Sequence, residues 1–395
     1  MLVSVPYRRY LIGALCLVGV WGCGDFEPLG DLEPWSLERE LTIGSIDDSD
    51  QALTSVGSMA VDARGTMFLT QPRERVIRVF SSAGEFVRTV GRDGQGPGEF
   101  QSMGYLGWMA DTLCIGDFLN QRVSLFGRDG SFVRSLNLMS PLIEDVFLPS
   151  VPDRMLPDGT ALVMPNYLSR SDDGDTVTAR PLFRIDTTGA VLLKLVEKSL
   201  DNEALVISMG TAAFAGPQPF GDSPLLAMPP DGGFVAVVER AVASEDGRGL
   251  IHVSKITIDG DTVFRRDIPY NPIPLPRHVV DSVLSARAEN FSNLPFFESV
   301  REARQALEEV VFVPDFYPPV STVRIGSDGR FWLKRENIAG PEARWDILST
   351  DGDPIAHVLL PSSTAIHESQ GALMWATERD ELNVTYVVRY RIMSQ

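Results

Sequence analysis

The amino-acid sequence predicts an all-β fold, a six-bladed β-propeller built from four-stranded antiparallel blades. Three observations lead to this prediction. A turn followed by a short apolar strand recurs six times along the chain, and a second turn follows in five of the repeats. The strand that the last repeat lacks has a counterpart near the N-terminus. Internal repeats are typical of propellers, in which each repeat forms one blade around a central channel.

The first turn of each repeat is rich in aspartate and glycine. Glycine adopts positive φ without strain and aspartate hydrogen-bonds to its own backbone, so both residues suit tight turns. Each turn precedes an apolar, strand-like run, such as residues 66–69 and 331–333. The six turns lie at residues 62–65, 110–111, 158–159, 231–232, 328–329 and 370–371. We therefore expect six blades of similar design.

A second turn in each of the first five repeats completes the pattern of a blade. The runs on either side of it are rich in β-branched and aromatic residues, as in 76–80 and 86–90. These turns lie at residues 82–84, 129–130, 188–189, 259–260 and 351–352. Two successive hairpins make a four-stranded antiparallel sheet.

The sixth repeat ends with its third strand, residues 384–392, close to the end of the chain. Residues 37–43 form a spare strand-like run near the N-terminus. If this run is the fourth strand of the last blade, the ring closes and no sheet edge is left open to aggregation. The prediction places Leu41 beside the strand around Val387.

The longest connection, residues 267–319, separates the fourth and fifth blades and contains helical patterns. Apolar residues recur at helical spacing from Arg277 to Asn290 and again from Phe297 to Glu309. We therefore expect a helical insertion at about residues 277–310. It could form a lid over the central funnel or a decoration packed on the rim, since both arrangements bury an apolar stripe.

The N-terminus has the anatomy of an export signal. Two arginines precede an apolar run at residues 10–20, which is shorter than the roughly 20 residues that span a membrane. The run ends in Val-Trp-Gly-Cys at Cys23, which resembles the lipobox of bacterial lipoproteins. This resemblance implies a signal peptide at 1–22 and a lipidated Cys23 in a tether at 23–35. The repeats then place the propeller at 36–395. The alternative is an ordinary secretory signal that is cleaved nearby.

Blades one and two resemble NHL repeats in residues 84–91, 94–100 and 117–126. The match covers roughly residues 58–138, and the resemblance is to divergent NHL-repeat-like six-bladed β-propeller lipoproteins of bacteria. It implies the propeller fold, and it does not extend to the RNA-binding or lyase branches. The glycine-rich stretch at 94–98 lacks the Gly-Lys-Ser/Thr ending of a phosphate-binding loop.

Charge and cysteine content narrow the possible partners. The formal net charge is −18, and removal of residues 1–22 takes away two arginines and no acids, which leaves −20. Such an acidic surface repels nucleic acid. With Cys23 lipidated, the mature chain has one other cysteine, Cys114, and a single cysteine cannot form a disulfide framework or a metal cluster. We expect an exported monomer, anchored by its lipid on the periplasmic side of a membrane or at the cell surface, with no cofactor predicted and calcium possible.

The long connections of the chain gather on one face of the predicted disc. In a meandering blade, the connections between the second and third strands, and from the fourth strand to the next blade, share a face. They lie at residues 164–178, 199–223, 239–249, 267–319 and 334–342. Long loops on a rigid scaffold are where binding usually occurs. This long-loop face is the candidate binding face, with Asn120, Tyr167 and Arg335 as candidate ligand contacts.

His367 and Glu368 fall on a predicted innermost strand, so they line the central channel and complete the candidate ligand contacts. A lone histidine there is more often a hydrogen-bonded structural residue than a metal ligand. The four histidines show no metal-ligand spacing, and no Gly-x-Ser-x-Gly motif marks a serine hydrolase. We therefore identify no catalytic or metal-binding residues.

Two functions remain open. The first is a non-catalytic scaffold that binds a protein, peptide or glycan through the long-loop face. The alternative is a metal-dependent hydrolase or lyase, because six-bladed propellers of the lactonase type hold calcium in the central funnel. Such a site needs several acidic, amide or imidazole side chains from different inner strands. The inner strands around 58–61, 105–108 and 323–325 look mostly apolar, which favours the scaffold and leaves catalysis uncertain.

Overall fold

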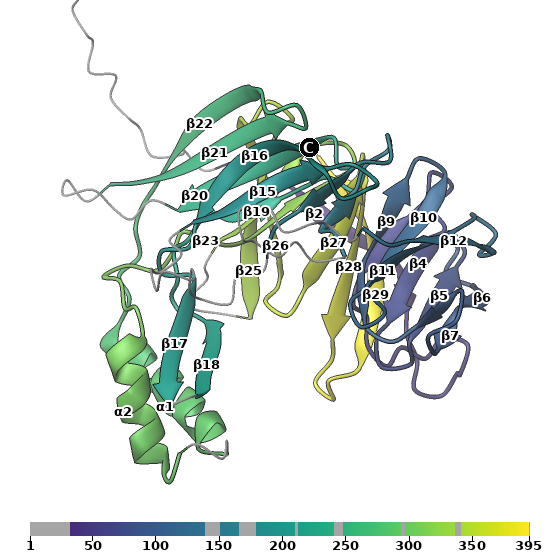
Figure 1. Ribbon diagram of the computed structural model, residues 1–395. Helices are drawn as coiled ribbons and strands as arrows, with labels where there is room; N and C mark the ends of the chain where they lie inside the picture. The colour runs from purple at the N-terminus through teal and green to yellow at the C-terminus, as the bar shows by residue number, and fades with distance from the viewer. Residues whose placement is uncertain are drawn as a thin grey trace, which may run out of the picture.

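The computed structural model describes residues 32–138, 151–165, 179–209, 212–240, 248–293, 297–335 and 341–394. Six four-stranded antiparallel blades form a ring, which confirms the predicted β-propeller (Figure 1). Within each blade the strands follow one another in chain order from the centre to the rim, except in the last blade.

The first three blades have these strands. Blade 1 contains β3 (Met59–Val61), β4 (Met67–Gln71), β5 (Val76–Phe80) and β6 (Phe86–Val90). Blade 2 contains β9 (Met103–Met109), β10 (Thr112–Asp117), β11 (Arg122–Phe126) and β12 (Phe132–Leu136). Blade 3 contains β13 (Arg154–Met155), β14 (Ala161–Val163), β15 (Ala179–Ile185) and β16 (Val191–Ser199).

The last three blades have these strands. Blade 4 contains β19 (Leu225–Ala227), β20 (Phe234–Arg240), β21 (Gly249–Thr257) and β22 (Thr262–Tyr270). Blade 5 contains β23 (Val320–Ile325), β24 (Phe331–Arg335), β25 (Glu342–Leu348) and β26 (Pro354–Pro361). Blade 6 contains β27 (Ala365–Gln370), β28 (Leu373–Arg379), β29 (Thr385–Met393) and, as its outer strand, β2 (Ser36–Ile43).

The N-terminal strand closes the ring as predicted. β2 pairs antiparallel with β29, with Leu41 opposite Arg389 and Ile43 opposite Val387. Before it reaches blade 6, the chain runs along the rim of blade 5, where β1 (Glu33–Pro34) pairs parallel with β26. The imidazole Nδ1 of His357 lies 2.9 Å from the carbonyl oxygen of Leu32. The first described residues therefore bind to two successive blades.

The hydrophobic core lies between neighbouring blades. Phe68 of blade 1 and Phe126 of blade 2 share one apolar cluster, and Trp332 of blade 5 and Tyr390 of blade 6 share another. Each blade therefore packs on both of its faces. This explains why second strands such as β4 are buried at every position, and why the sequence shows continuous apolar runs there.

The turns have the predicted chemistry. The carboxylate Oδ1 of Asp186 accepts hydrogen bonds from the backbone amides of Thr188 and Ala190, and Gly189 has a φ of 87°. The glycine-rich stretch after blade 1 is a structural connection, in which β7 (Arg92–Asp93) pairs with β8 (Glu99–Phe100). It delivers the buried ring of Phe100 to the core between blades 1 and 2.

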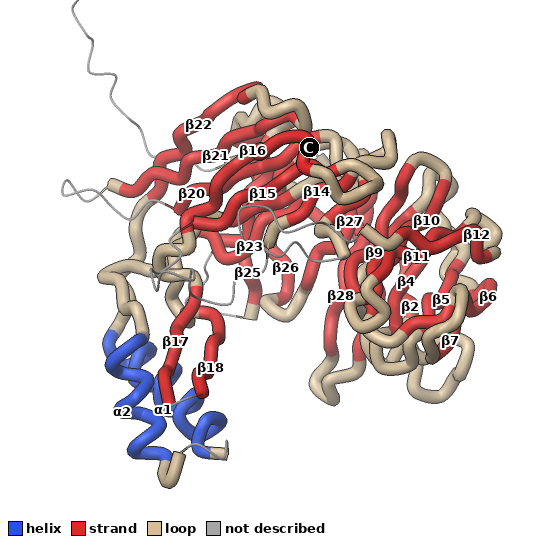
Figure 2. The backbone as a smooth tube through the Cα atoms, in the orientation of Figure 1, coloured by secondary structure: helices blue, strands red, loops and turns tan. Residues whose placement is uncertain are grey.

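The insertion between blades 4 and 5 is helical, as predicted. It contains α1 (Arg277–Ser292) and α2 (Val300–Val310), and the Ser299 side chain caps α2 by accepting a hydrogen bond from the Glu302 amide. Both helices pack on a hairpin that the sequence analysis treated as a loop, β17 (Ala204–Met209) and β18 (Ala212–Pro217). Together they project from the disc (Figures 1 and 2). In the described part of the chain, no helix is long and apolar enough to cross a membrane.

Candidate functional site

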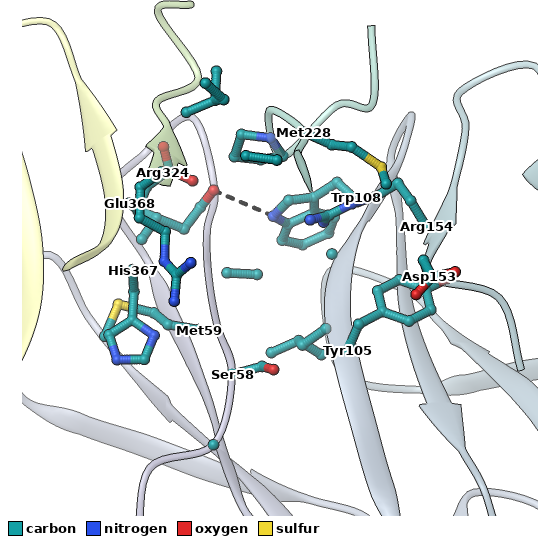
Figure 3. A pocket seen from close by; sticks show the side chains of 18 of the residues that line it. Ser58, Met59, Tyr105, Trp108, Asp153, Arg154, Met228, Arg324, His367 and Glu368 are labelled. Carbon is teal, nitrogen blue, oxygen red and sulfur yellow. Dashed lines mark hydrogen bonds between the residues drawn. The ribbon is translucent and has the colours of Figure 1, made fainter. Parts of the chain in front are cut away.

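The inner strands of all six blades surround a cavity of about 340 Å³ at the centre of the ring, here called the funnel (Figure 3). Its described lining contains no residue of α1 or α2. The lining residues are Gly57 to Val61, Tyr105 to Trp108, Asp153, Arg154, Leu226 to Met228, Pro230, Val323 to Ile325, His367 and Glu368. Gly57, Ser58 and Asp153 precede their inner strands, so this end of the funnel belongs to the long-loop face.

Arg154 reaches into the funnel from the start of β13. Its stem packs beside Gly232 and its guanidinium lies against Gly107, where a Cβ atom would come within 2.9 Å of Nη1. The guanidinium carbon is 5.8 Å from the centre of the Tyr105 ring. Within the described part of the chain, Arg154 forms no ion pair and no hydrogen bond, and its Nε is buried without a partner.

Burial sets the electrostatics of this arginine. Desolvation lowers the pKa of the Arg154 guanidinium, because the funnel wall disfavours the charged form. An arginine nevertheless stays protonated at physiological pH. The funnel therefore contains a buried positive charge that no acidic group of the described chain neutralises by direct contact.

Arg324 is a second arginine of the funnel and comes from β23. Its Nε donates to the Ile366 carbonyl at 3.1 Å and its Nη1 to the Val323 carbonyl at 3.1 Å. Its Nη2 makes no hydrogen bond with a described residue. Desolvation lowers its pKa as well. Arg324 and Arg154 reach into the funnel from opposite sides (Figure 3).

His367 and Glu368 both line the funnel, although they are adjacent in β27. Side chains normally alternate between the two faces of a strand, but the pairing of β27 with β28 shifts register between Ile366 and Glu368. This irregularity turns two successive side chains toward the cavity. Burial, aided by the nearby Arg324, lowers the pKa of His367 to about 4, and its Nε2 lies 3.0 Å from the Thr377 hydroxyl. The imidazole is therefore neutral at pH 7.

The pKa of Glu368 shifts in the opposite direction from that of His367. Burial raises the pKa of its carboxyl to about 7, although its Oε1 accepts hydrogen bonds from the backbone amides of Ser327 and Ser369, both at 3.0 Å. Near neutral pH this carboxyl exists in both protonation states, so it can give or take a proton within the funnel.

Asp153 and Trp108 complete the polar lining. The Asp153 carboxylate accepts a hydrogen bond from the Met164 amide at 2.6 Å and opens onto the cavity, while the surrounding wall desolvates it and raises its pKa. The indole Nε1 of Trp108 donates to the Val61 carbonyl at 3.2 Å, which holds the ring in the wall (Figure 3).

A second cavity of about 220 Å³ continues from the funnel toward the face with the short turns. The two cavities share Val61, Trp108, Pro230 and Glu368 in their linings. Glu368 therefore stands where they meet.

The structure brings only two of the predicted site residues into the funnel, His367 and Glu368. Asn120 lies in a loop of blade 2, where its side-chain amide donates to the Gly94 carbonyl and to Asp117. Arg335 lies 3.4 Å from the Asp346 carboxylate and stacks over the Tyr270 ring. Both have structural partners and lie outside the funnel lining. Tyr167 and Cys23 fall outside the described residues.

The sequence analysis missed the two funnel arginines. Arg324 is the single charged residue between Val323 and Ile325 in a run that looks mostly apolar, and Arg154 follows Asp153 in a short, turn-like run. A charge within a predicted innermost strand is the signal that could have found them, because such a strand has nowhere to place that charge except the channel.

Among the described residues, no group of three or more histidine, cysteine, aspartate or glutamate side chains is placed to hold a metal ion. The fold and the site together define a six-bladed propeller with a polar, arginine-containing funnel.

No family model matches the chain, and no curated protein matches its sequence. Solved structures are similar in fold. A member of the DUF4221 family from Bacteroides vulgatus is 10% identical with a TM-score of 0.50, and the match covers 91% of this chain and 99% of that one. A candidate exported protein from Bacteroides fragilis is 11% identical with a TM-score of 0.45, over 91% and 96% of the chains.

A gluconolactonase from Xanthomonas campestris is 12% identical with a TM-score of 0.40, over 92% of this chain and 99% of that one. At such low identity, the likeness to the DUF4221 structure supports the fold alone.

Proposed function

We propose that this protein is an exported, lipid-anchored propeller that binds a small ligand in its central funnel, entered from the long-loop face. One observation carries the proposal. Side chains from different blades meet in one cavity, and two of them have polar atoms without hydrogen-bond partners among the described residues: Nε of Arg154 and Nη2 of Arg324. Polar groups that converge on a concave cavity are a usual feature of a small-molecule site.

Filling the funnel tests this proposal. Ser58 lines the end of the funnel on the long-loop face, so Ser58→Trp would block it. The matched control is Ser82→Trp, on an exposed turn of blade 1. Small molecules from a cell extract that raise the Tm of the wild type and of the control should fail to do so with Ser58→Trp. Equal shifts in all three proteins would contradict funnel binding.

The membrane anchor is a separate part of the proposal and rests on the signal-like N-terminus. In a bacterial host, Cys23→Ser should move the protein from the membrane fraction to the soluble exported fraction. Mass spectrometry of the wild-type N-terminus should show a diacylated cysteine at position 23. An unmodified N-terminus elsewhere would instead support an ordinary secretory signal.

A second candidate is a hydrolase or lyase acting on the bound ligand, and Glu368 favours it. A carboxyl with a pKa of about 7 inside a cavity is suited to general acid–base catalysis. The metal-dependent form of this chemistry would need further ligand groups around the funnel. Turnover that Glu368→Gln abolishes while ligand binding persists would establish the enzyme, and metal analysis of the purified mature domain would detect bound calcium or zinc.

A further inference from the structure

We infer that the ligand of the funnel carries a carboxylate or phosphate group and that Arg154 binds this anion. The inference rests on the proposed function and specifies the chemical class of the ligand. The Arg154 side chain is the central observation, because it is a partly buried cation of the funnel wall with no ion pair and no hydrogen bond to the described chain.

A buried charge without a partner is costly. Removing an ion from water costs several kcal/mol even after the surrounding protein relaxes, and an arginine cannot avoid the cost by losing its proton. A side chain that only had to fill this space could be apolar. An arginine with no ion pair or hydrogen bond among the described residues is expected where a ligand supplies the missing negative charge.

The surrounding backbone makes room for this side chain. Two glycines from different blades stand beside it: Gly232 at its stem, and Gly107 at its head, where Nη1 lies 2.9 Å from the position of an added Cβ. The guanidinium is thereby carried from blade 3 to the inner strand of blade 2. Its planar fork of donors matches carboxylate and phosphate oxygens in pairs.

The charged and titratable groups facing the cavity also favour an anion. Arg324 adds a second cation from the opposite side, and His367 is neutral. The acids near Arg154 are Asp153, Glu368 and the more distant Asp231, and none forms an ion pair with it. Burial also holds Glu368 toward its neutral form. The funnel therefore has more positive charge than its own acids neutralise.

The remainder of the wall indicates the body of the ligand. Met59, Leu106, Trp108 and Met228 offer apolar and aromatic surface around the two guanidinium groups. A molecule with one anionic head and a planar or apolar body fits this lining. Benzoate is a minimal probe of that kind, and benzamide has the same shape without the charge.

The experiment uses the mature protein and three probes: benzoate, benzamide and inorganic phosphate. Calorimetry should show benzoate binding at least tenfold tighter than benzamide. Arg154→Met should weaken benzoate binding at least tenfold, while Arg266→Met, which removes an arginine from the outer strand of blade 4, should leave it unchanged. Phosphate tighter than benzoate identifies a phosphate ligand, and the reverse order identifies a carboxylate.

The stability of the ligand-free variants is an independent readout. Methionine has a similar length and no charge, so Arg154→Met should have the same or a higher Tm than the wild type when no ligand is present. A lower Tm, comparable to that of a truncated core residue, would mean that Arg154 is structural and would overturn the inference. If Arg154→Met does not fold, Arg154→Lys is the deciding variant, because lysine keeps the positive charge but lacks the paired N–H donors of the guanidinium. Unchanged benzoate binding by Arg154→Lys would overturn the inference.

The outcomes separate this inference from the proposed function. Suppose that Ser58→Trp blocks the binding of extract molecules but Arg154→Met leaves it intact. This result would support ligand binding in the funnel and contradict an anionic ligand. The absence of benzoate and phosphate binding to the wild type would also reject the anion, while leaving the extract assay to judge the funnel.

Discussion

At the residue scale, two adjacent side chains of β27 line one cavity, yet their pKa values shift in opposite directions. Burial disfavours the charged form of each group, which raises the pKa of Glu368 to about 7 and lowers that of His367 to about 4. Near pH 7 His367 is therefore neutral and Glu368 is only partly ionised. These shifts make the stability of the protein depend on pH.

Glu368→Gln should remove the part of this dependence that appears as pH rises. The carboxyl titrates near 4.5 when unfolded and near 7 when folded, so folding favours its proton. Its favourable contribution is complete below pH 4.5 and is lost as pH rises through 7, a change on the order of 3 kcal/mol at about 1.4 kcal/mol per pKa unit. In urea unfolding, the variant should match the wild type at pH 5 and exceed it at pH 8. The exposed Glu85→Gln should show no such difference, and neither should the Glu368 variant if the carboxyl titrates normally.

His367→Gln should reveal a pH dependence of stability with the opposite sign. The imidazole titrates near 6.5 when unfolded and near 4 when folded, so its contribution is present above pH 6.5 and is lost as pH falls through 4. The wild type should lose stability over this range by an amount on the order of 3 kcal/mol more than the variant. The control is His278→Gln on the exposed side of α1. Parallel pH profiles for wild type and His367→Gln would contradict the assigned shift.

The candidate site was only partly predictable at this scale. His367 and Glu368 could be placed because the repeat located the innermost strand. Arg154 was invisible because β13 has only two residues, too few to show alternation, and its partners Gly107 and Gly232 come from other blades. Pairing across blades depends on the assembled ring, which no local pattern encodes.

At the element scale, the closure of blade 6 depends on a polar cluster as well as on strand pairing. Glu378 of β28 is buried and accepts hydrogen bonds from Arg39 of β2 at 2.5 Å, from Tyr390 of β29, and from Thr364 at 3.3 Å. Burial and the nearby carboxylate raise the pKa of Tyr390 to about 12, so its hydroxyl remains a donor. One carboxylate thus joins the first described segment to the last.

Glu378→Gln should weaken this closure. An amide keeps the shape but cannot receive three donors as a charged acceptor, and hydrogen bonds to charged groups contribute about 1.5–3 kcal/mol each. We expect a loss of about 1–3 kcal/mol in the free energy of unfolding, since Arg39 is half exposed to water. Hydrogen exchange should accelerate first in β2 and β29. The exposed Glu381→Gln is the control, and equal stability of the two variants would rule out this role.

The blades were predictable as elements because turn, strand and turn recur with consistent chemistry. The hairpin β17–β18 was not, because its buried Leu205 and Ile207 are explained only by helices α1 and α2, which lie far along the chain. Likewise, β1 has two residues and becomes a strand only where β26 offers an edge. Both elements owe their structure to tertiary partners.

At the scale of the whole molecule, the acidic surface and the cationic funnel oppose each other. A net charge of −18 repels an approaching anion, whereas the two guanidinium groups attract it at short range. Salt screens the long-range repulsion far more than the buried contact, because the Debye length falls to about 8 Å at physiological ionic strength.

The association rate of benzoate should therefore rise when sodium chloride is increased from about 10 to about 150 mM, where the Debye length shortens from about 30 to 8 Å. Stopped-flow quenching of tryptophan fluorescence can follow this rate, since Trp108 lines the funnel. Benzamide, which is neutral, should show no such change. A rate that falls with salt would mean that the field of the funnel extends beyond the acidic surface.

The path of the chain before it closes the ring has a consequence for how the protein stands on a membrane. β1 runs along the outermost strand of blade 5, so the chain leaves the disc at its rim rather than at either face. With Cys23 as the anchor, eight residues separate it from Leu32, an extended reach of about 30 Å at most. The disc would then stand edge-on to the lipid, with both openings of its channel facing sideways into solvent. A soluble ligand could reach the long-loop opening without passing between protein and membrane.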